Sequence, residues 1–162
     1  MSPLLRSHAN VPAAPAATGS GSRCRPVMLA TLAVPFEAES ARIAIQAAME
    51  GGVKLIVVDA VEMPLWPQAM TTRRAELETV EDRAEICRMA GHAAALGLEV
   101  EHLRVRSPRP VEAVLELCGE REAGLLVLGP DPSRLRPRSF RRAVRRVRKR
   151  ASCLLWVAGE GP

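Results

Sequence analysis

The chain has very few aromatic residues: two Trp, two Phe and no Tyr among 162 residues. Proteins that bind single-stranded nucleic acid commonly stack bases on aromatic side chains, so this kind of surface is largely missing here. The cysteines form no CxxC pair and no Cys/His cluster, which excludes the familiar zinc patterns and leaves no predicted metal site. We expect reduced, mostly buried thiols in a cytoplasmic protein at these four positions: Cys24, Cys87, Cys118 and Cys153.

Long apolar runs are also missing. No stretch approaches the roughly 18 apolar residues of a membrane-spanning helix, so we expect no transmembrane segment. Residues 1–22 are rich in Ala, Pro, Ser and Gly and contain no acid, and Pro12 and Pro15 interrupt any hydrophobic run of the kind that a targeting peptide has. We therefore expect a disordered N-terminal tail over residues 1–24 and a single domain over residues 25–160.

Positive charge is concentrated in one segment. The chain carries 23 Lys or Arg against 18 Asp or Glu, for a net charge of +5. Residues 134–150 hold ten of these cations and no acid, which leaves 13 cations against 18 acids, a sum of −5, for the rest of the chain. Because like charges at this density repel one another, the fold must either offset the repulsion or use it to hold an anion.

Short apolar runs alternate with longer amphipathic segments from residue 26 onward. Strands are predicted at residues 27–32, 53–58, 98–106, 125–128 and 153–157, and helices at residues 37–50, 79–97, 110–124 and 140–151. This alternation predicts an α/β fold: a single-domain, doubly wound, Rossmann-like parallel sheet of five strands in the order 3-2-1-4-5. We expect four strand residues in its core: Leu29, Ile56, Leu126 and Leu155.

In such sheets, ligands bind outside the carboxyl ends of the strands, at the point where the strand order reverses. The loops at residues 33–36 and 129–138 follow the first and fourth strands and form this edge. Gly129 opens the second loop, and the prolines at 132 and 137 predict that Arg134 and Arg138 also lie in it. These three residues are our candidate site for a phosphate or another anion, the alternative being a solvated loop.

The chain resembles the universal stress protein family over residues 26–159. The resemblance rests on the βαβ spacing, on Ile-Val-Val-Asp-Ala-Val-Glu at 56–62, on Gly-Leu-Leu-Val-Leu-Gly at 124–129 and on Arg-Ala-Ser-Cys-Leu-Leu-Trp-Val at 150–157. It implies a five-stranded α/β fold and a homodimer formed through the last strand. That family divides into members that bind ATP and members that do not.

The ATP-binding members of that family share the motif Gly-x2-Gly-x9-Gly-Ser/Thr, whose glycines let backbone N–H groups approach phosphates. Gly129 matches the first position, but the same spacing then gives Pro132, Arg142 and Ala143. Proline has no N–H, and the family's acidic residue after the first strand is missing from residues 32–36. We therefore expect no strong ATP site and no tightly bound cofactor, with ATP or AMP binding weakly at most.

The basic segment itself predicts a helix with one apolar stripe, formed by Phe140, Ala143, Val144, Val147 and Ala151. Cations occupy the remaining positions. The alternative to an anion-binding function is a solvated helix face, but arginine forks suit phosphate and carboxylate recognition. The anion surface is predicted to consist of Arg141, Arg142, Arg145, Arg146 and Lys149.

No catalytic constellation is recognisable. Asp59 and Glu62, at the end of the second strand, are expected to neutralise nearby arginines. The sequence therefore favours a binding or regulatory module with an Arg-rich anion surface, partnered by a polyanion or an acidic protein, and not an enzyme. Two alternatives stay open: a nucleotide-binding stress protein with an arginine-based phosphate site and slow ATP hydrolysis, and a nucleic-acid-associated protein that contacts the phosphate backbone.

Overall fold

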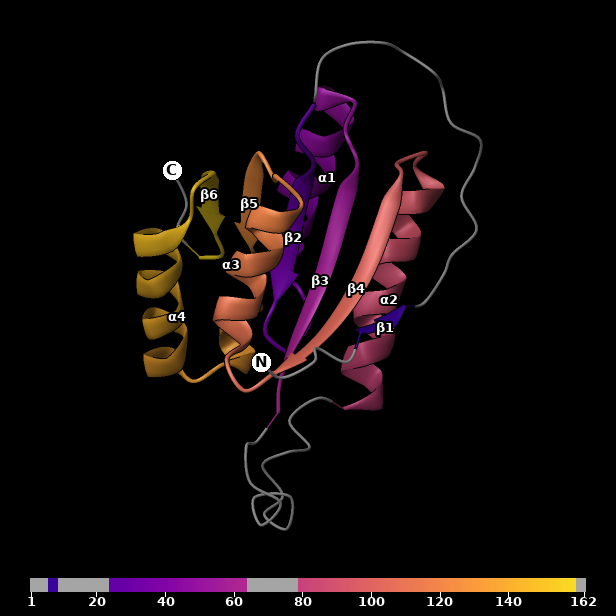
Figure 1. Ribbon diagram of the computed structural model, residues 1–162. Helices are drawn as coiled ribbons and strands as arrows, with labels where there is room; N and C mark the ends of the chain where they lie inside the picture. Colours follow the sequence, from indigo (N-terminus) through magenta and orange to yellow (C-terminus); the bar gives the residue numbers. More distant parts are fainter. Residues whose placement is uncertain (1–5, 9–23, 64–78, 160–162) are drawn as a thin grey trace.

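The computed structural model describes residues 6–8, 24–63 and 79–159. A single sheet lies between two layers of helices (Figure 1). The strands are β1 (Arg6–His8), β2 (Val27–Thr31), β3 (Leu55–Glu62), β4 (Val100–Ser107), β5 (Leu125–Leu128) and β6 (Leu154–Val157). The helices are α1 (Ala38–Gly51), α2 (Val80–Ala95), α3 (Pro110–Glu120) and α4 (Pro137–Arg150), with a short 3-10 turn, η2 (Pro132–Arg134), before α4.

Five of the strands are parallel and lie in the order β4-β3-β2-β5-β6. Counted along the chain from β2, this is the order 3-2-1-4-5, so the predicted fold class and strand order are confirmed. The chain leaves β2 through α1 toward β3, and it leaves β5 through α4 toward β6, in the opposite direction. The strand order therefore reverses between β2 and β5, whose carboxyl ends lie at Thr31 and Leu128.

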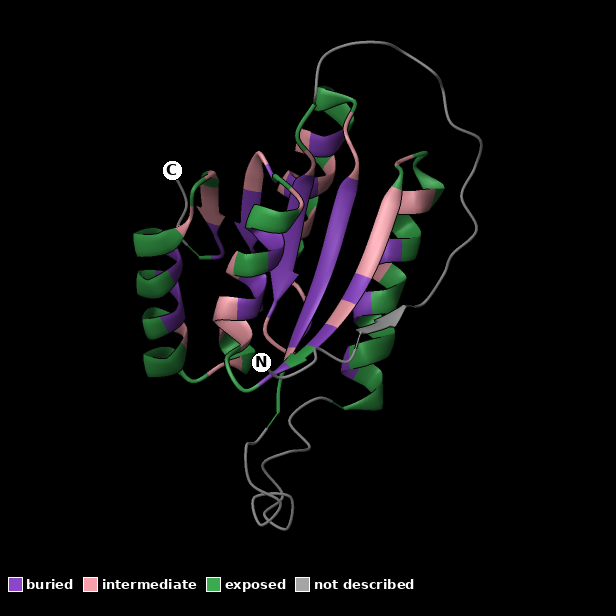
Figure 2. Cartoon of the chain, in the orientation of Figure 1, coloured by how far each residue is buried: buried purple, intermediate pink, exposed green. Residues whose placement is uncertain are grey.

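The two faces of the sheet have separate cores because alternate strand residues point to opposite sides. Leu29 and Val57 pack against α1 and α2, whereas Met28 and Ile56 pack against α3 and α4. Figure 2 shows the central strands buried and the outer sides of the helices exposed. Burial on both faces explains why β2 and residues 55–58 of β3 are nearly continuous apolar runs without polar alternation.

Three of the four predicted core residues are fully buried, namely Leu29, Ile56 and Leu126. Leu155 is only partly buried, which corrects our expectation. The reason is its place on β6, which ends the sheet and has β5 as its one neighbouring strand in the described sheet.

One strand differs from the sequence-based expectation. Arg6–His8 forms β1, which pairs antiparallel with β4 and completes a six-stranded sheet. A disordered tail over residues 1–24 therefore does not describe these three residues. The outer edge of β4 has unpaired backbone groups that an extended segment can satisfy, and single-strand patterning does not reveal such a partner. The rest of the expected tail, residues 1–5 and 9–23, lies outside the described residues.

The basic helix also begins earlier than expected. Pro137 is its first residue, so Arg138 lies in the first turn of α4 and not in a loop. Proline is favoured at this position because its fixed φ suits a helix start and its missing N–H would have no helical partner there. The loop after β5 is therefore shorter, and Arg138 belongs with the other α4 cations.

Candidate functional site

The two loops at the reversal point of the sheet are joined by their own backbones. The Glu37 N–H donates to the Gly129 carbonyl, and the Asp131 N–H donates to the Pro35 carbonyl, each at 2.9 Å. An isolated antiparallel bridge lies next to these bonds. Backbone hydrogen bonds therefore link the two loops at the edge where an open α/β sheet usually admits a ligand, and we call this place the closed reversal point.

The loop after β5 also satisfies its own N–H groups. The Ser133 N–H and hydroxyl donate to Asp131 Oδ1 at 2.9 and 2.7 Å, and the Arg134 N–H donates to the Asp131 carbonyl at 3.1 Å. The Asp131 carboxylate and carbonyl thus accept the N–H groups of Ser133 and Arg134, which a phosphate in this loop would need. Sequence reasoning missed this role, although an Asp two residues before a Ser is a recognised turn signal.

Gly129 is buried, and its missing side chain serves packing. A Cβ built at this position would lie 2.5 Å from the Ser40 Cβ and 3.2 Å from a methyl carbon of Leu29. Ser40 is itself buried in the first turn of α1, where its hydroxyl donates to Glu37 at 2.7 Å. The missing side chain of Gly129 therefore lets α1 pack closely against the end of β5.

Arg134 crosses from η2 to the start of α2, where it forms an ion pair with Asp82. Asp82 is buried and closes a capping box with Thr79, as the sequence pattern at the start of this helix predicts. Arg138, by contrast, is exposed on α4, on the other side of the sheet. The structure therefore does not gather Gly129, Arg134 and Arg138 around one cavity.

A second charged group lies on the α1–α2 side of the sheet, in the middle of β3 and β4, because β3 continues to Glu62 and Asp59 does not end it. Asp59 is 2% exposed and pairs with the largely buried Arg104, whose Nε lies 3.8 Å from the carboxylate. The pKa of the neighbouring His102 is lowered by burial and by the positive charges of Arg104 and Arg83. Asp59 therefore neutralises an arginine, whereas Glu62, at the end of β3, is exposed.

The predicted anion surface lies on α4, and its five residues are all exposed: Arg141, Arg142, Arg145, Arg146 and Lys149. Two of them have partners. Arg146 Nη1 lies 2.8 Å from Glu112 Oε1 on α3, and Arg141 donates weakly to the Pro137 carbonyl at 3.4 Å. An acid on α3 thus neutralises part of the positive charge of this surface.

Three residues of this surface, together with Arg138, follow a single line along α4: Arg138, Arg142, Arg145 and Lys149. We call this line the α4 ridge. Its spacing of four, three and four residues places it opposite the buried stripe of Ala143, Val144 and Val147. Within the described part of the chain, no acid pairs with any ridge cation.

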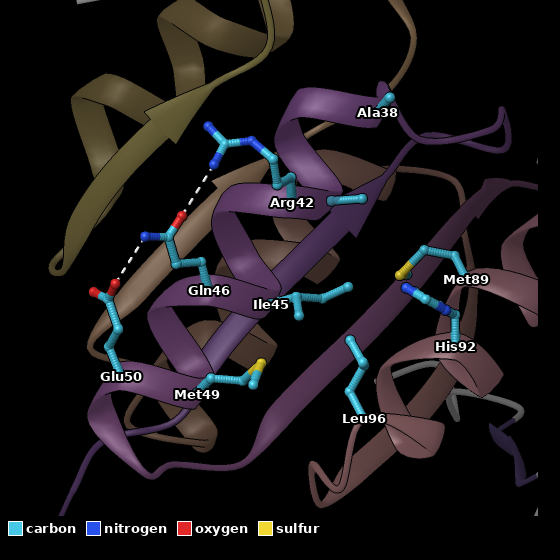
Figure 3. A pocket seen from close by; sticks show the side chains of 10 residues that line it. Ala38, Arg42, Ile45, Gln46, Met49, Glu50, Met89, His92 and Leu96 are labelled. Carbon is cyan, nitrogen blue, oxygen red and sulfur yellow. Dashed lines mark hydrogen bonds between the residues drawn. The ribbon is translucent and has the colours of Figure 1, made fainter.

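A groove of about 530 Å³ lies between α1 and α2 (Figure 3). Ile45, Met49 and Leu96 give it an apolar floor, and Arg42, Gln46 and Glu50 form a hydrogen-bonded row along one rim. None of the predicted site residues lines it.

Other ligand chemistry is sparse in the described ranges. No three His, Cys, Asp or Glu side chains come together as metal ligands there, and no described helix is long and apolar enough to cross a membrane. Cys24 and Cys87 are exposed, which corrects the expectation of mostly buried thiols, whereas Cys118 is buried and Cys153 is partly buried.

Comparison with known proteins finds likeness in structure only. No family model and no curated protein sequence matches the chain. A universal stress protein solved in complex with cAMP superposes with a TM-score of 0.61 and 19% identity, covering 85% of this chain and 99% of that one. The chain has the universal stress protein fold.

Two further structures with this fold agree. The universal stress protein UspA from Lactobacillus plantarum has a TM-score of 0.57 and 13% identity, covering 82% of this chain and 97% of that one. The universal stress protein from Archaeoglobus fulgidus in complex with dAMP has a TM-score of 0.56 and 19% identity, covering 82% and 96%. The fold implied by the sequence resemblance is therefore confirmed.

Proposed function

We propose that this universal stress protein-like chain is a binding module without enzymatic activity, which binds a linear polyanion along α4. The single observation that carries the proposal is the α4 ridge. It contrasts with Arg134 and Arg146, which come from the same basic segment but are paired with Asp82 and Glu112.

The geometry of the ridge favours an extended ligand. At 1.5 Å per residue, successive ridge cations rise by about 6, 4.5 and 6 Å along the helix, so the four cover about 16.5 Å. Such a row does not converge on one small phosphate, but it can face a series of phosphates in polyphosphate or along a nucleic-acid strand. Arginine also offers planar forks that match phosphate oxygens.

The closed reversal point supports the second half of the proposal, the lack of a strong nucleotide site. The N–H groups at Gly129, Asp131 and Ser133 all donate to protein acceptors. A nucleotide phosphate would have to displace these bonds before it could use the same donors, and it would meet the carboxylate of Asp131.

The test is the binding of labelled polyphosphate and of a DNA duplex, measured by fluorescence anisotropy at two salt concentrations. If four phosphates of a duplex are neutralised, the log–log slope is about −3.6, so affinity falls about 150-fold between about 50 and 200 mM salt. We expect little sequence preference, because phosphate contacts carry no base information.

A matched pair of variants separates the ridge from net charge. The ridge variant replaces Arg138, Arg142, Arg145 and Lys149 by Gln. The control variant removes the same charge from exposed arginines elsewhere: Arg83, Arg88, Arg106 and Arg109. The ridge variant should lose binding and the control should keep most of it. If both variants lose the same amount of binding affinity, binding depends on overall charge and not on the ridge. If the parent protein binds polyphosphate but does not bind the duplex, the nucleic-acid alternative is excluded.

A second candidate function is nucleotide binding with an arginine-based phosphate site. The solved complexes of universal stress proteins with cAMP and dAMP favour it, because those proteins have the same fold. In this chain, Arg134 would have to leave Asp82 to reach a phosphate at the strand ends. Calorimetry with ATP and AMP tests this candidate. Micromolar affinity that is lost in Arg134→Ala would establish a nucleotide site, and it would overturn the proposal that the chain lacks one.

We also propose that the protein is a homodimer formed through β6 and that it resides in the cytoplasm. β6 is at the edge of the sheet, and Leu154, at its start, is 74% exposed. An edge strand with unpaired backbone groups and apolar side chains favours pairing with a second copy. The four free cysteines are consistent with a reducing compartment.

A further inference from the structure

Two cysteines that are 35 residues apart in the sequence meet between α3 and the beginning of β6. The sulfur atoms of Cys118 and Cys153 lie 3.2 Å apart, close enough for a thiol–thiol hydrogen bond. Cys118 is 4% exposed in the last turn of α3, and Cys153 is partly exposed just before β6. A disulfide needs the two sulfur atoms to approach to about 2.05 Å, so a movement of about 1 Å would join them.

We propose that Cys118 and Cys153 form a reversible modification site, which low-molecular-weight disulfides oxidise to an intrachain disulfide. This inference is independent of the proposed polyanion binding. It depends on the contact of the two sulfur atoms and on their unequal exposure.

The chemistry is thiol–disulfide exchange in two steps. Cys153, as thiolate, attacks one sulfur of the small disulfide RSSR, forms a mixed disulfide Cys153–SR and releases RS⁻. Cys118 then gives up its proton and attacks Cys153 Sγ, so that the Cys118–Cys153 bond forms and the second RS⁻ leaves. The two protein thiols lose two electrons and two protons, and the small disulfide is reduced to two RSH molecules.

The surroundings of the two thiols assign the order of attack. Burial and the neighbouring Cys153 thiol raise the pKa of Cys118 to about 12, so Cys118 stays protonated and shielded at neutral pH. Cys153 is the member of the pair that a dissolved disulfide can reach. The buried thiol then acts as the resolving group, because it already lies next to Cys153 Sγ.

The new bond would tie α3 to the segment that connects α4 with β6. The last backbone hydrogen bond of α4 runs from the Ala151 N–H to the Val147 carbonyl at 2.7 Å, two residues before Cys153. Oxidation should therefore slow hydrogen exchange of the amides near Ala151 while leaving distant amides, such as those of α2, unchanged.

The experiment uses the full chain with Cys24→Ser and Cys87→Ser, both exposed positions, so that only the proposed pair remains. The reduced protein is incubated with oxidised glutathione and analysed by intact mass and peptide mapping. We expect a product lighter by about 2 Da, in which the peptides of Cys118 and Cys153 are joined, and which dithiothreitol reverses. An unreacted chain, a lasting glutathione adduct or a disulfide between two chains would overturn the proposal.

Two further variants in this background test the order of attack. With Cys118→Ser, Cys153 should stop at the stable glutathione adduct because the resolving thiol is missing. With Cys153→Ser, the shielded Cys118 should react at least tenfold more slowly than Cys153 does. A Cys118 that is modified as fast as Cys153 would show that the assigned order is wrong. Circular dichroism verifies folding. If either variant fails to fold, the chain that keeps both Cys118 and Cys153 still shows whether the disulfide forms.

Discussion

The clearest test of the closed reversal point is Gly129→Ala. If Gly129 serves the packing of β5 against α1, a single added methyl group must destabilise the fold whether or not any ligand is present. The Ala Cβ would lie 2.5 Å from the Ser40 Cβ, closer than carbon atoms approach one another. Because both residues are buried, either a strand end or a helix must move.

Overpacking of a well-packed interior costs about 1–3 kcal/mol of unfolding free energy. For a chain of this length, such a loss lowers Tm by about 2–4 °C per kcal/mol, so we expect a decrease of about 2–12 °C. Urea denaturation measures the free energy directly. Ser40→Gly removes the group that the new methyl meets, and the cost of Gly129→Ala should fall by about 1 kcal/mol or more in that background.

Gly91→Ala is the matched control. Gly91 lies inside α2, and a Cβ at this position would meet no atom within 4 Å apart from the neighbouring backbone of its own helix. The same substitution should therefore stabilise the protein by about 0.5–1 kcal/mol through helix propensity. The packing argument is refuted if Gly129→Ala is as stable as the parent, or if its cost is unchanged by Ser40→Gly.

Three further predictions concern the dimer, the nucleotide site and alkaline pH. Leu154→Arg should turn the proposed dimer into a monomer in sedimentation experiments without loss of stability, whereas Met49→Arg, also exposed but on α1, should not. ATP titration calorimetry should give no heat of tight binding, because the N–H groups of the loop after β5 already donate to protein acceptors; micromolar affinity would contradict this. Finally, the raised pKa of Cys118 means that the unfolded chain loses this proton near pH 9 and the folded chain near pH 12. Urea midpoints should therefore fall as pH rises above about 9, and this part of the loss should be missing in Cys118→Ala.

Sequence reasoning predicted the sheet because the pattern that specifies it is local and is repeated along the chain. Apolar runs separated by amphipathic segments specify parallel strands with helical crossovers, and the handedness of such crossovers leaves few strand orders. It did not predict β1, because three residues carry no periodic signal and their partner, β4, lies about 100 residues further along the chain. It placed the start of α4 three residues late, since the apolar stripe begins at Phe140 although the helix begins at Pro137.

The site was less predictable because its decisive contacts join distant parts of the chain. The missing glycines of the phosphate motif are visible in the sequence, but the pairing of Arg134 with Asp82, 52 residues earlier, is not. The packing of Ser40 on Gly129 likewise depends on how α1 meets β5. Only the bond between Asp131 and Ser133 has a local signal, the Asx-type turn.

The basic segment divides into a part whose charge the fold compensates and a part that it leaves uncompensated. The ridge contains three cation pairs at helical spacing, Arg138–Arg142, Arg142–Arg145 and Arg145–Lys149, and each such pair costs about 0.2–0.5 kcal/mol. Arg138 also lies in the first turn of α4, where no acid is present and the helix dipole disfavours a cation.

Removing the ridge charges should therefore stabilise the free protein. Glutamine has nearly the helix propensity of arginine and lysine, so the four Gln substitutions should raise the unfolding free energy by about 1 kcal/mol at low salt, and by less as salt screens the repulsion. The control variant on Arg83, Arg88, Arg106 and Arg109 should show no such gain. Denaturation at low and high salt measures both. A ridge variant that is more stable but binds no polyanion would show that the ridge cations destabilise the free protein and serve to bind the ligand. A ridge variant that is less stable than the parent would mean that these cations support the fold itself, and the binding proposal would lose its main argument.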